Sequence, residues 1–173
     1  TGFGTGLNYL ATWKAWQADP RACRRLHYVA VEKHPFRVDD LIRLHAAWPE
    51  LADLAAALHA AWPTLAPGSH RLELAGGAVV LTLLLGDGLT RLRKLRAGID
   101  AFYLDGFAPA QNPELWSPAL FGELGRLANW GASLATWSVA QPVRERLYEA
   151  GFKTDTAPGF GRKKERLVGR LVR

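Results

Sequence analysis

The chain contains no methionine, only one cysteine and no long apolar run. Cys23 alone cannot form an internal disulfide, which suits a reducing cytosol. No apolar stretch approaches the ~18 residues that a membrane span needs, and no signal peptide is visible. We therefore expect a cytoplasmic protein without membrane contact. Because methionine is missing and a motif begins at the first residues, we also expect a piece of a longer protein.

Two classes of catalytic site are excluded by what the residues do not form. The histidines do not cluster with metal-ligand spacing, and no serine, histidine and aspartate set is visible, so we expect neither a metal nor a catalytic triad. At 173 residues and 49% hydrophobic content, the chain can build one domain over residues 1–173 with its own core. The net charge of +6 weakly favours a polyanionic partner.

A glycine-rich loop opens the chain, with Gly2, Gly4 and Gly6 in the pattern G-x-G-x-G before a helical pattern. Such a loop lets the backbone approach a ligand closely and aims N–H groups at an anionic part of it. A dinucleotide site would need its third glycine at position 7, which is Leu7. The spacing instead suits S-adenosylmethionine. In a wound α/β sheet a strand comes before this loop, so we expect a first strand that lies before Thr1.

Strand and helix patterns alternate along the rest of the chain. We expect strands at 26–32, 71–74, 78–85, 99–105 and 133–137, and two more around a basic turn near the end. We expect helices at 5–18, 35–45, 49–60, 88–96, 113–128 and 140–150. The pattern predicts a doubly wound α/β fold, with a mostly parallel sheet, helices on both faces and a C-terminal antiparallel hairpin. Ligands of such folds bind beyond the carboxyl ends of the strands.

Acidic residues stand at three of these strand ends. Glu32 could accept both ribose hydroxyls of an adenosyl ligand, or be a surface acid paired with Lys33. Asp87 could accept from the adenine amino group, or serve as a turn former or helix cap. Asp105 would lie above the middle of the sheet, near a transferred group, or form an Asx turn.

The C-terminal segment combines one aromatic residue with several cations. Phe160 lies between two glycines and precedes Arg162, Lys163 and Lys164. This combination suits an unstacked base with its phosphate backbone, although a solvated basic face is the alternative. Trp116 is either a core anchor or a stacking platform.

Four segments occur in order along the chain: Gly2–Asn8, Val31–Lys33, Leu104–Pro109 with Asn112, Pro113 and Trp116, and Gly159–Lys163. Taken together, they resemble the methyltransferase domain of the MnmC family, which completes 5-methylaminomethyl-2-thiouridine at the wobble position of certain tRNAs. The resemblance covers nearly the whole chain, and the Asp-Gly-Phe-Ala-Pro loop is its most specific part.

The resemblance implies a class I S-adenosylmethionine-dependent methyltransferase with a Rossmann-like fold, whose first, central strand is missing here. That strand would lie between those ending at Glu32 and Asp105, so the chain without it should be poorly stable and bind its cofactor weakly. The implied reaction transfers a methyl group to the amine of 5-aminomethyl-2-thiouridine in tRNA. In full-length relatives an FAD-dependent oxidoreductase domain usually follows, so FAD is expected only if that domain exists outside this chain.

The resemblance also assigns roles to residues. Asp105 would be the catalytic residue that holds the amine and accepts its proton. The segment 137–141 differs from the smaller threonine- and serine-containing segment typical of the family and borders the acceptor pocket. The implied cofactor residues are Gly2, Gly4, Gly6, Glu32, Lys33, Asp87 and Asp105. The implied substrate residues are Phe107, Pro109, Trp116, Phe160, Arg162, Lys163 and Lys164.

Three alternatives stay open at the level of the sequence. A methyltransferase could act on another amine, in a protein or a small molecule. A nucleotide-dependent oxidoreductase could use the same glycine loop, although Leu7 in place of glycine counts against it. A non-catalytic RNA-binding module would bind tRNA without transferring a methyl group.

Overall fold

The computed structural model describes residues 1–159, 161 and 163–172. The chain divides into two compact units, Gly2–Asp87 and Thr1 together with Gly88–Arg173, and each is described by itself. Two residues that the sequence assigns to the substrate, Phe160 and Arg162, lie outside the described residues. Within the described part of the chain, no helix is long and apolar enough to cross a membrane.

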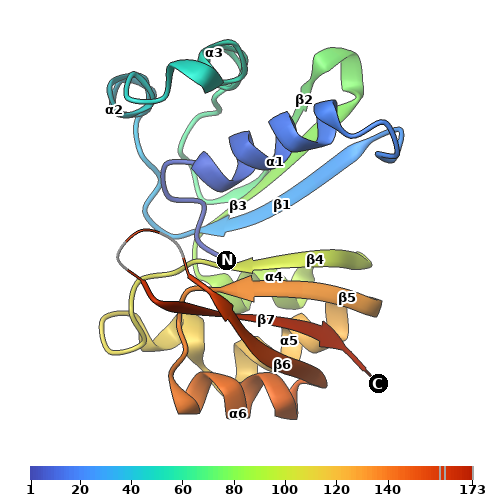
Figure 1. The fold of residues 1–173 in the computed structure, drawn as a ribbon. Helices are drawn as coiled ribbons and strands as arrows, with labels where there is room; N and C mark the ends of the chain where they lie inside the picture. The colour runs from blue at the N-terminus through green and yellow to red at the C-terminus, as the bar shows by residue number, and fades with distance from the viewer. Residues whose placement is uncertain (160, 162, 173) are drawn as a thin grey trace. The chain divides into compact units, whose positions relative to one another are not determined.

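The unit Gly2–Asp87 is a three-stranded sheet with helices on it (Figure 1). The strand order is β1-β3-β2, with β3 parallel to β1 and antiparallel to β2. Helix α1 packs on β1, α3 packs on α1, and α2 packs on α3. The strands are β1 (Leu26–Glu32), β2 (Gly68–Leu74) and β3 (Val79–Leu85). The helices are α1 (Leu7–Ala18), α2 (Val38–His45), α3 (Ala52–Ala60) and the 3-10 turns η1 (Pro49–Leu51) and η2 (Ala75–Gly77).

The glycine loop is anchored to the core of this unit through Phe3. The Phe3 side chain is buried, and its ring centroid lies 6.2 Å from that of Tyr9 and 5.5 Å from that of Trp62. The same core contains Leu10 and Trp13 of α1 and alternate residues of β3, from Val79 to Leu85. Burial of these side chains holds the loop at the end of the sheet because one of its own residues is part of the core.

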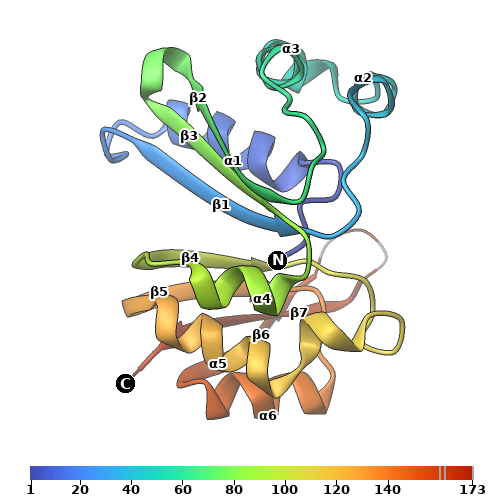
Figure 2. The same cartoon turned by 180° about the vertical axis from the view of Figure 1, so that it is seen from behind.

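The other unit is a four-stranded sheet in the order β4-β5-β7-β6. β4 and β5 are parallel, whereas β7 is antiparallel to both β5 and β6. Helices α4, α5 and α6 lie side by side on one face of this sheet (Figure 2). The strands are β4 (Ile99–Leu104), β5 (Ala128–Thr136), β6 (Phe152–Pro158) and β7 (Glu165–Leu171). The helices are α4 (Gly88–Lys94), α5 (Pro118–Leu127), α6 (Gln141–Glu149) and the 3-10 turn η3 (Pro113–Trp116).

The α/β fold class is confirmed, with more antiparallel pairing than expected. Of the pairings, β1–β3 and β4–β5 are parallel, while the hairpin at Gly76 and the C-terminal hairpin bring in the antiparallel strands. The C-terminal hairpin is confirmed, and its strand β7 also pairs antiparallel with β5. Each hairpin therefore reverses the chain locally, without a crossover helix.

The largest differences from the predicted helices are at α2 and α5. Helix α2 begins at Val38 rather than Pro35, because Arg37 is extended and two acids follow in the first turn. The single helix expected over 113–128 is broken at Ser117. Its hydroxyl oxygen accepts a hydrogen bond from the Leu120 N–H at 3.3 Å, and Pro118 follows as the first residue of α5. A serine cap before a proline is a strong helix start, so the new helix begins there.

Candidate functional site

The three glycines of the opening loop all adopt left-handed backbone conformations. Their φ angles are 79° at Gly2, 55° at Gly4 and 78° at Gly6. At Gly6 an added Cβ would also lie 2.7 Å from the Phe3 ring, whereas the space beside Gly4 is open. The loop therefore requires glycine for its backbone, and it leaves open space at Gly4 for a ligand.

Hydrogen bonds fix the path of this loop against the end of β1. The N–H groups of Gly2 and Phe3 both donate to the Val31 carbonyl, at 3.1 and 3.2 Å. The Gly6 N–H donates to the Phe3 carbonyl at 2.8 Å. Among the residues that the structure describes, the Thr5 N–H makes no hydrogen bond. The loop thus has a defined shape with an N–H group left over for a ligand.

Glu32 links the loop to the strand ends with both oxygens of its carboxylate. Its Oε2 accepts from the Gly4 N–H and its Oε1 from the His34 N–H, each at 2.8 Å. A carboxylate offers about four lone-pair positions, so about two remain for ligand hydroxyls. The sequence predicted Glu32 as a ligand group or as a surface acid paired with Lys33, and its hydrogen bond to the loop is visible only in the structure.

Asp87 is brought to the same sheet end as Glu32. The register pairs Glu32 with Leu85, and the Gly86 N–H donates to the Glu32 carbonyl at 2.8 Å. The side chain of Asp87 is exposed just beyond this bond, as is that of Lys33 beyond Glu32. The unit Gly2–Asp87 therefore gathers the glycine loop, Glu32, Lys33 and Asp87 at one end. This end offers open space beside Gly4, the N–H group of Thr5 and the carboxylates of Glu32 and Asp87. These groups fit an adenosyl ligand that carries an amino-acid group.

In the other unit, two indoles support the loop that follows Asp105: the buried Trp116 and the half-buried Trp137. The Trp116 Nε1–H donates to the Phe107 carbonyl at 2.7 Å, and the Trp137 Nε1–H donates to the Gly106 carbonyl at 3.2 Å. The two rings meet edge to face at 6.2 Å. Trp116 is 2% exposed, which favours the core-anchor interpretation, whereas Phe107 is 76% exposed. The side chain of Asp105 is exposed at the start of this supported loop.

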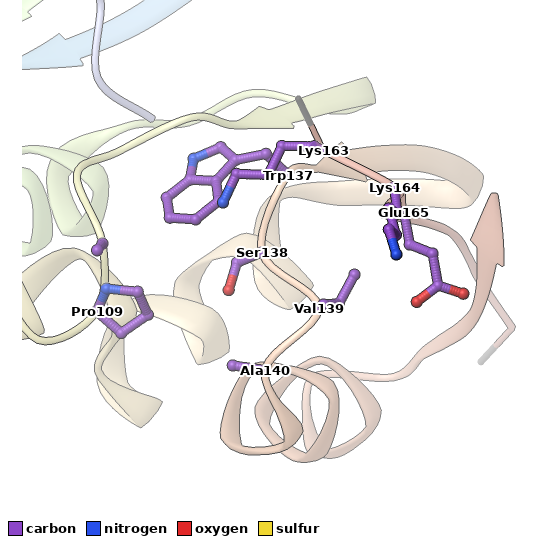
Figure 3. A pocket seen from close by; sticks show the side chains of 9 residues that line it. Pro109, Trp137, Ser138, Val139, Ala140, Lys163, Lys164 and Glu165 are labelled. Atoms are coloured by element: carbon purple, nitrogen blue, oxygen red, sulfur yellow. The ribbon is translucent and has the colours of Figure 1, made fainter. Parts of the chain in front are cut away.

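A pocket of about 440 Å³ opens next to this loop (Figure 3). The Lys163 ammonium lies 4.7 Å from the centroid of the Trp137 ring, a cation–π contact on the face of the indole. The pocket brings together three of the predicted substrate residues: Pro109, Lys163 and Lys164. It is lined by Ala108, Pro109, Trp137, Ser138, Val139, Ala140, Lys163, Lys164 and Glu165.

Trp137 was missing from the predicted substrate residues, although it forms a wall of this pocket. The sequence indicated that its segment, 137–141, departs from the family pattern and borders the acceptor pocket, but it assigned no role to Trp137 itself. A signal was present, since Trp137 directly follows β5 and the carboxyl ends of parallel strands are where ligands bind.

The chain is similar to known methyltransferases in sequence. The family model of S-adenosyl-L-methionine-dependent methyltransferases matches residues 49–171. The chain is 62% identical over 170 residues to the tRNA 5-methylaminomethyl-2-thiouridine biosynthesis bifunctional protein MnmC of Aromatoleum aromaticum, and 60% identical over 172 residues to that of Azoarcus sp.. These matches cover 98% and 99% of this chain, which spans 27% of the length of each relative.

A solved structure agrees with the relatives. The crystal structure of MnmC2 from Aquifex aeolicus matches with a TM-score of 0.75 and 26% identity, over 98% of this chain and 51% of that one. The family match extends over more than half of the residues and includes β3, β4 and β5, which carry Asp87, Asp105 and Trp137 at their ends. The chain belongs to the family of S-adenosyl-L-methionine-dependent methyltransferases.

Proposed function

We propose that the chain transfers a methyl group from S-adenosylmethionine to the amine of 5-aminomethyl-2-thiouridine at the tRNA wobble position, giving 5-methylaminomethyl-2-thiouridine. The observation that carries this proposal is the 62% identity, over 98% of the chain, to a relative named for the biosynthesis of that nucleoside. The two sets of side chains described above support it, one suited to the cofactor and the other to a base on a charged backbone.

The cofactor groups belong to the unit Gly2–Asp87. Bound S-adenosylmethionine supplies an electrophilic methyl group on its sulfonium. We assign its amino-acid portion to the loop of Gly2, Gly4 and Gly6, where the Thr5 N–H is available. The remaining acceptor positions of Glu32 suit ribose hydroxyls, and Asp87 suits the adenine amino group, with Lys33 beside them.

We propose that Asp105 accepts the proton that the substrate amine loses. An alkyl amine has a pKa of roughly 10, so it is mostly protonated at neutral pH and must lose a proton before its lone pair can attack. A carboxylate at the end of β4 can hold the amine and accept that proton. It would also favour the ammonium form, so exclusion of water from the site should help by lowering the basicity of the amine. Catalysis then consists mainly of positioning.

The RNA groups belong to the other unit. The Trp137 face and the exposed Phe107 ring suit unstacked bases, and Lys163 and Lys164 suit phosphates. Trp116 contributes by fixing the Phe107 carbonyl rather than by offering a free face. Phe160 and Arg162 stay predictions of the same kind.

We further propose that residues 1–173 are an N-terminally truncated methyltransferase domain, preceded by a strand. The Thr1 amino group donates to the Tyr103 carbonyl at 2.6 Å, and the Asp105 N–H donates to the Thr1 carbonyl at 3.3 Å. This pair of bonds is the pattern of a parallel ladder beside β4, which is the edge strand of its sheet. Chain that precedes Thr1 would extend this ladder along β4.

The relatives are named bifunctional, and this chain covers about a quarter of them. We propose that an FAD-dependent oxidoreductase domain, fused or separate, makes the amine that this domain methylates. An enzyme of tRNA wobble uridines would work in the cytoplasm.

The truncation proposal is tested by adding the natural upstream residues to 1–173. The longer chain should have a higher melting temperature and bind S-adenosylhomocysteine more tightly, because ladder groups of β4 gain partners and the glycine loop gains its support. A cooperative transition of 1–173 alone, stabilised by the ligand as much as that of the longer chain, would contradict it.

The substrate and the role of Asp105 are tested together in single-turnover reactions of the full-length protein. Purified tRNA that carries 5-aminomethyl-2-thiouridine should gain one methyl group, and tRNA that lacks the aminomethyl group should gain none. The Asp105→Ala variant should lose about 100-fold or more in rate, the range of general acid–base catalysis, and should lose far less in cofactor affinity than in rate. The control Asp155→Ala removes an exposed acid of β6 and should behave as wild type. Equal losses of rate and cofactor affinity would refute the catalytic role.

The RNA assignment is tested by the salt dependence of tRNA binding. Charge reversal of Lys163 and Lys164 should weaken binding and reduce the slope of log affinity against log salt by roughly 0.7–0.9 for each lost phosphate contact. Reversal of Arg93 and Lys94, exposed on α4, is the matched control and should change the slope less. An unchanged slope in the Lys163 and Lys164 double variant would contradict the RNA assignment and would indicate that this segment is a solvated basic surface.

A further inference from the structure

A chain of hydrogen bonds runs from the glycine loop into two histidines on separate helices. The Nε2 of His45 lies 2.7 Å from the Thr5 carbonyl oxygen, and its Nδ1 lies 2.8 Å from the Nε2 of His59. The planes of the two imidazoles are nearly parallel, at 12°, and their centroids lie 5.0 Å apart. His45 is 4% exposed, so it makes these bonds away from water.

The partners determine where the protons lie. The Thr5 carbonyl can only accept, so the Nε2 of His45 must carry its hydrogen. A neutral imidazole carries one N–H, so the Nδ1 of His45 is then an acceptor, and the hydrogen between the rings belongs to the Nε2 of His59. His59 thereby fixes the tautomer that His45 needs to hold Thr5.

The bond to Thr5 completes the support of the loop. The Thr5 carbonyl and the Gly6 N–H belong to one peptide plane. His45 donates to this carbonyl, and this N–H donates to the Phe3 carbonyl, so the plane is fixed at both ends. On the other side of Thr5, the Gly4 N–H is held by Glu32. The peptide that carries the Thr5 N–H lies between these two fixed planes. Its direction is therefore set by Glu32 and His45 together.

We propose that His45 is a positioning residue of the cofactor loop, which sets the direction of the Thr5 N–H, and that His59 acts through His45 by fixing its tautomer. The inference rests on the cofactor of the family and not on the identity of the RNA substrate. A methyltransferase of any acceptor would need the same loop geometry, so the two proposals can fail separately.

Protonation gives the pair a measurable signature. Burial, and then repulsion from a protonated His45, lower the pKa of His59 from its ordinary value of 6.5. A proton can add to the Nδ1 of His59 without breaking the hydrogen bond between the rings, because the Nε2 of His59 is the donor in that bond. Since the pKa is lower in the folded state, the unfolded chain binds more protons below pH 6.5. The free energy of unfolding should therefore fall as the pH drops below that value.

Other charged groups on the packed elements are occupied or exposed. On α2, Arg43 pairs with Asp40, and Asp39 is exposed. On α1, the Lys14 ammonium donates to the Glu50 carbonyl of η1 at 3.1 Å. The carboxylates of Glu50 and of Asp53 on α3 are exposed. These exposed groups interact with the pair only through water and salt, so the fall in stability below pH 6.5 is assigned to His59.

The test compares His45→Phe, which removes the donor, with His45→Gln, whose amide can donate from a similar position. Calorimetric titration of the full-length variants with S-adenosylhomocysteine at pH above 7 should show about tenfold weaker binding for His45→Phe, the equivalent of one hydrogen bond. His45→Gln should restore most of the affinity, and the control His27→Gln, an exposed histidine of β1, should bind as wild type. Binding by His45→Phe as tight as wild type, or an equal loss in His45→Gln, would overturn the proposal.

A second readout needs no ligand. Nitrogen-15 NMR of the imidazoles should show His45 as the Nε2–H tautomer, and His59→Leu should release that preference and remove the loss of stability below pH 6.5. An Nδ1–H tautomer of His45 in the wild type, or an unchanged pH dependence in His59→Leu, would contradict the proposal even if every variant folds.

Discussion

The hydrogen bond from the Gly4 N–H to the Glu32 carboxylate is the constraint on which the cofactor half of the molecule depends. It is made at the end of β1, where the carbonyl of the same glutamate accepts from Gly86 and its second carboxylate oxygen accepts from His34. One residue therefore ties the glycine loop, its own turn and the end of β3 together. A hydrogen bond to a charged acceptor is worth more than a neutral one, so this tie can hold a backbone of three left-handed glycines in one shape.

The acceptor half is built on a different physical principle. There the loop after Asp105 is supported by two indole N–H groups, which donate to the carbonyls of Gly106 and Phe107. The two indole rings pack edge to face. A loop rich in glycine and proline has few backbone partners of its own, and the indoles supply them. Trp137 serves twice, because the ring that holds Gly106 also forms a wall of the pocket under Lys163.

The sequence predicts the parts of this protein whose signals are local. The segment 26–32 becomes β1 with the same bounds, because its aromatic and β-branched residues favour an extended strand. The acids at strand ends are also local signals, since each follows such a segment. The break at Ser117 could be predicted too, because serine before proline is a start signal that a longer helical pattern obscured.

What depends on tertiary packing is not visible in the sequence. His45 and His59 are 14 residues apart, and the sequence shows no cluster of histidines with metal-ligand spacing. Only the packing of α3 against α2 brings their rings within hydrogen-bond distance. The second role of Glu32 needs the loop to fold back onto β1. Trp137 becomes a pocket residue because Lys163, far along the chain, reaches its face. In each case the functional contact joins residues of two elements that are separated along the chain, so no short stretch of sequence shows it.

The central claim is that the Glu32-held glycine loop is an S-adenosylmethionine site, and calorimetry of the full-length protein with Glu32→Gln tests it most directly. The Gly4 and His34 N–H groups donate to different oxygens of the Glu32 carboxylate, and in glutamine one of these becomes an NH2 group, which donates, so the two N–H groups cannot both keep their present acceptors. Loss of one hydrogen bond to a charged group, about 1.5–3 kcal/mol, predicts roughly 10- to 100-fold weaker binding of S-adenosylhomocysteine. The wild type should bind this ligand and not NADH. Equal affinity of Glu32→Gln and wild type for S-adenosylhomocysteine, or tighter binding of NADH by the wild type, would contradict the account.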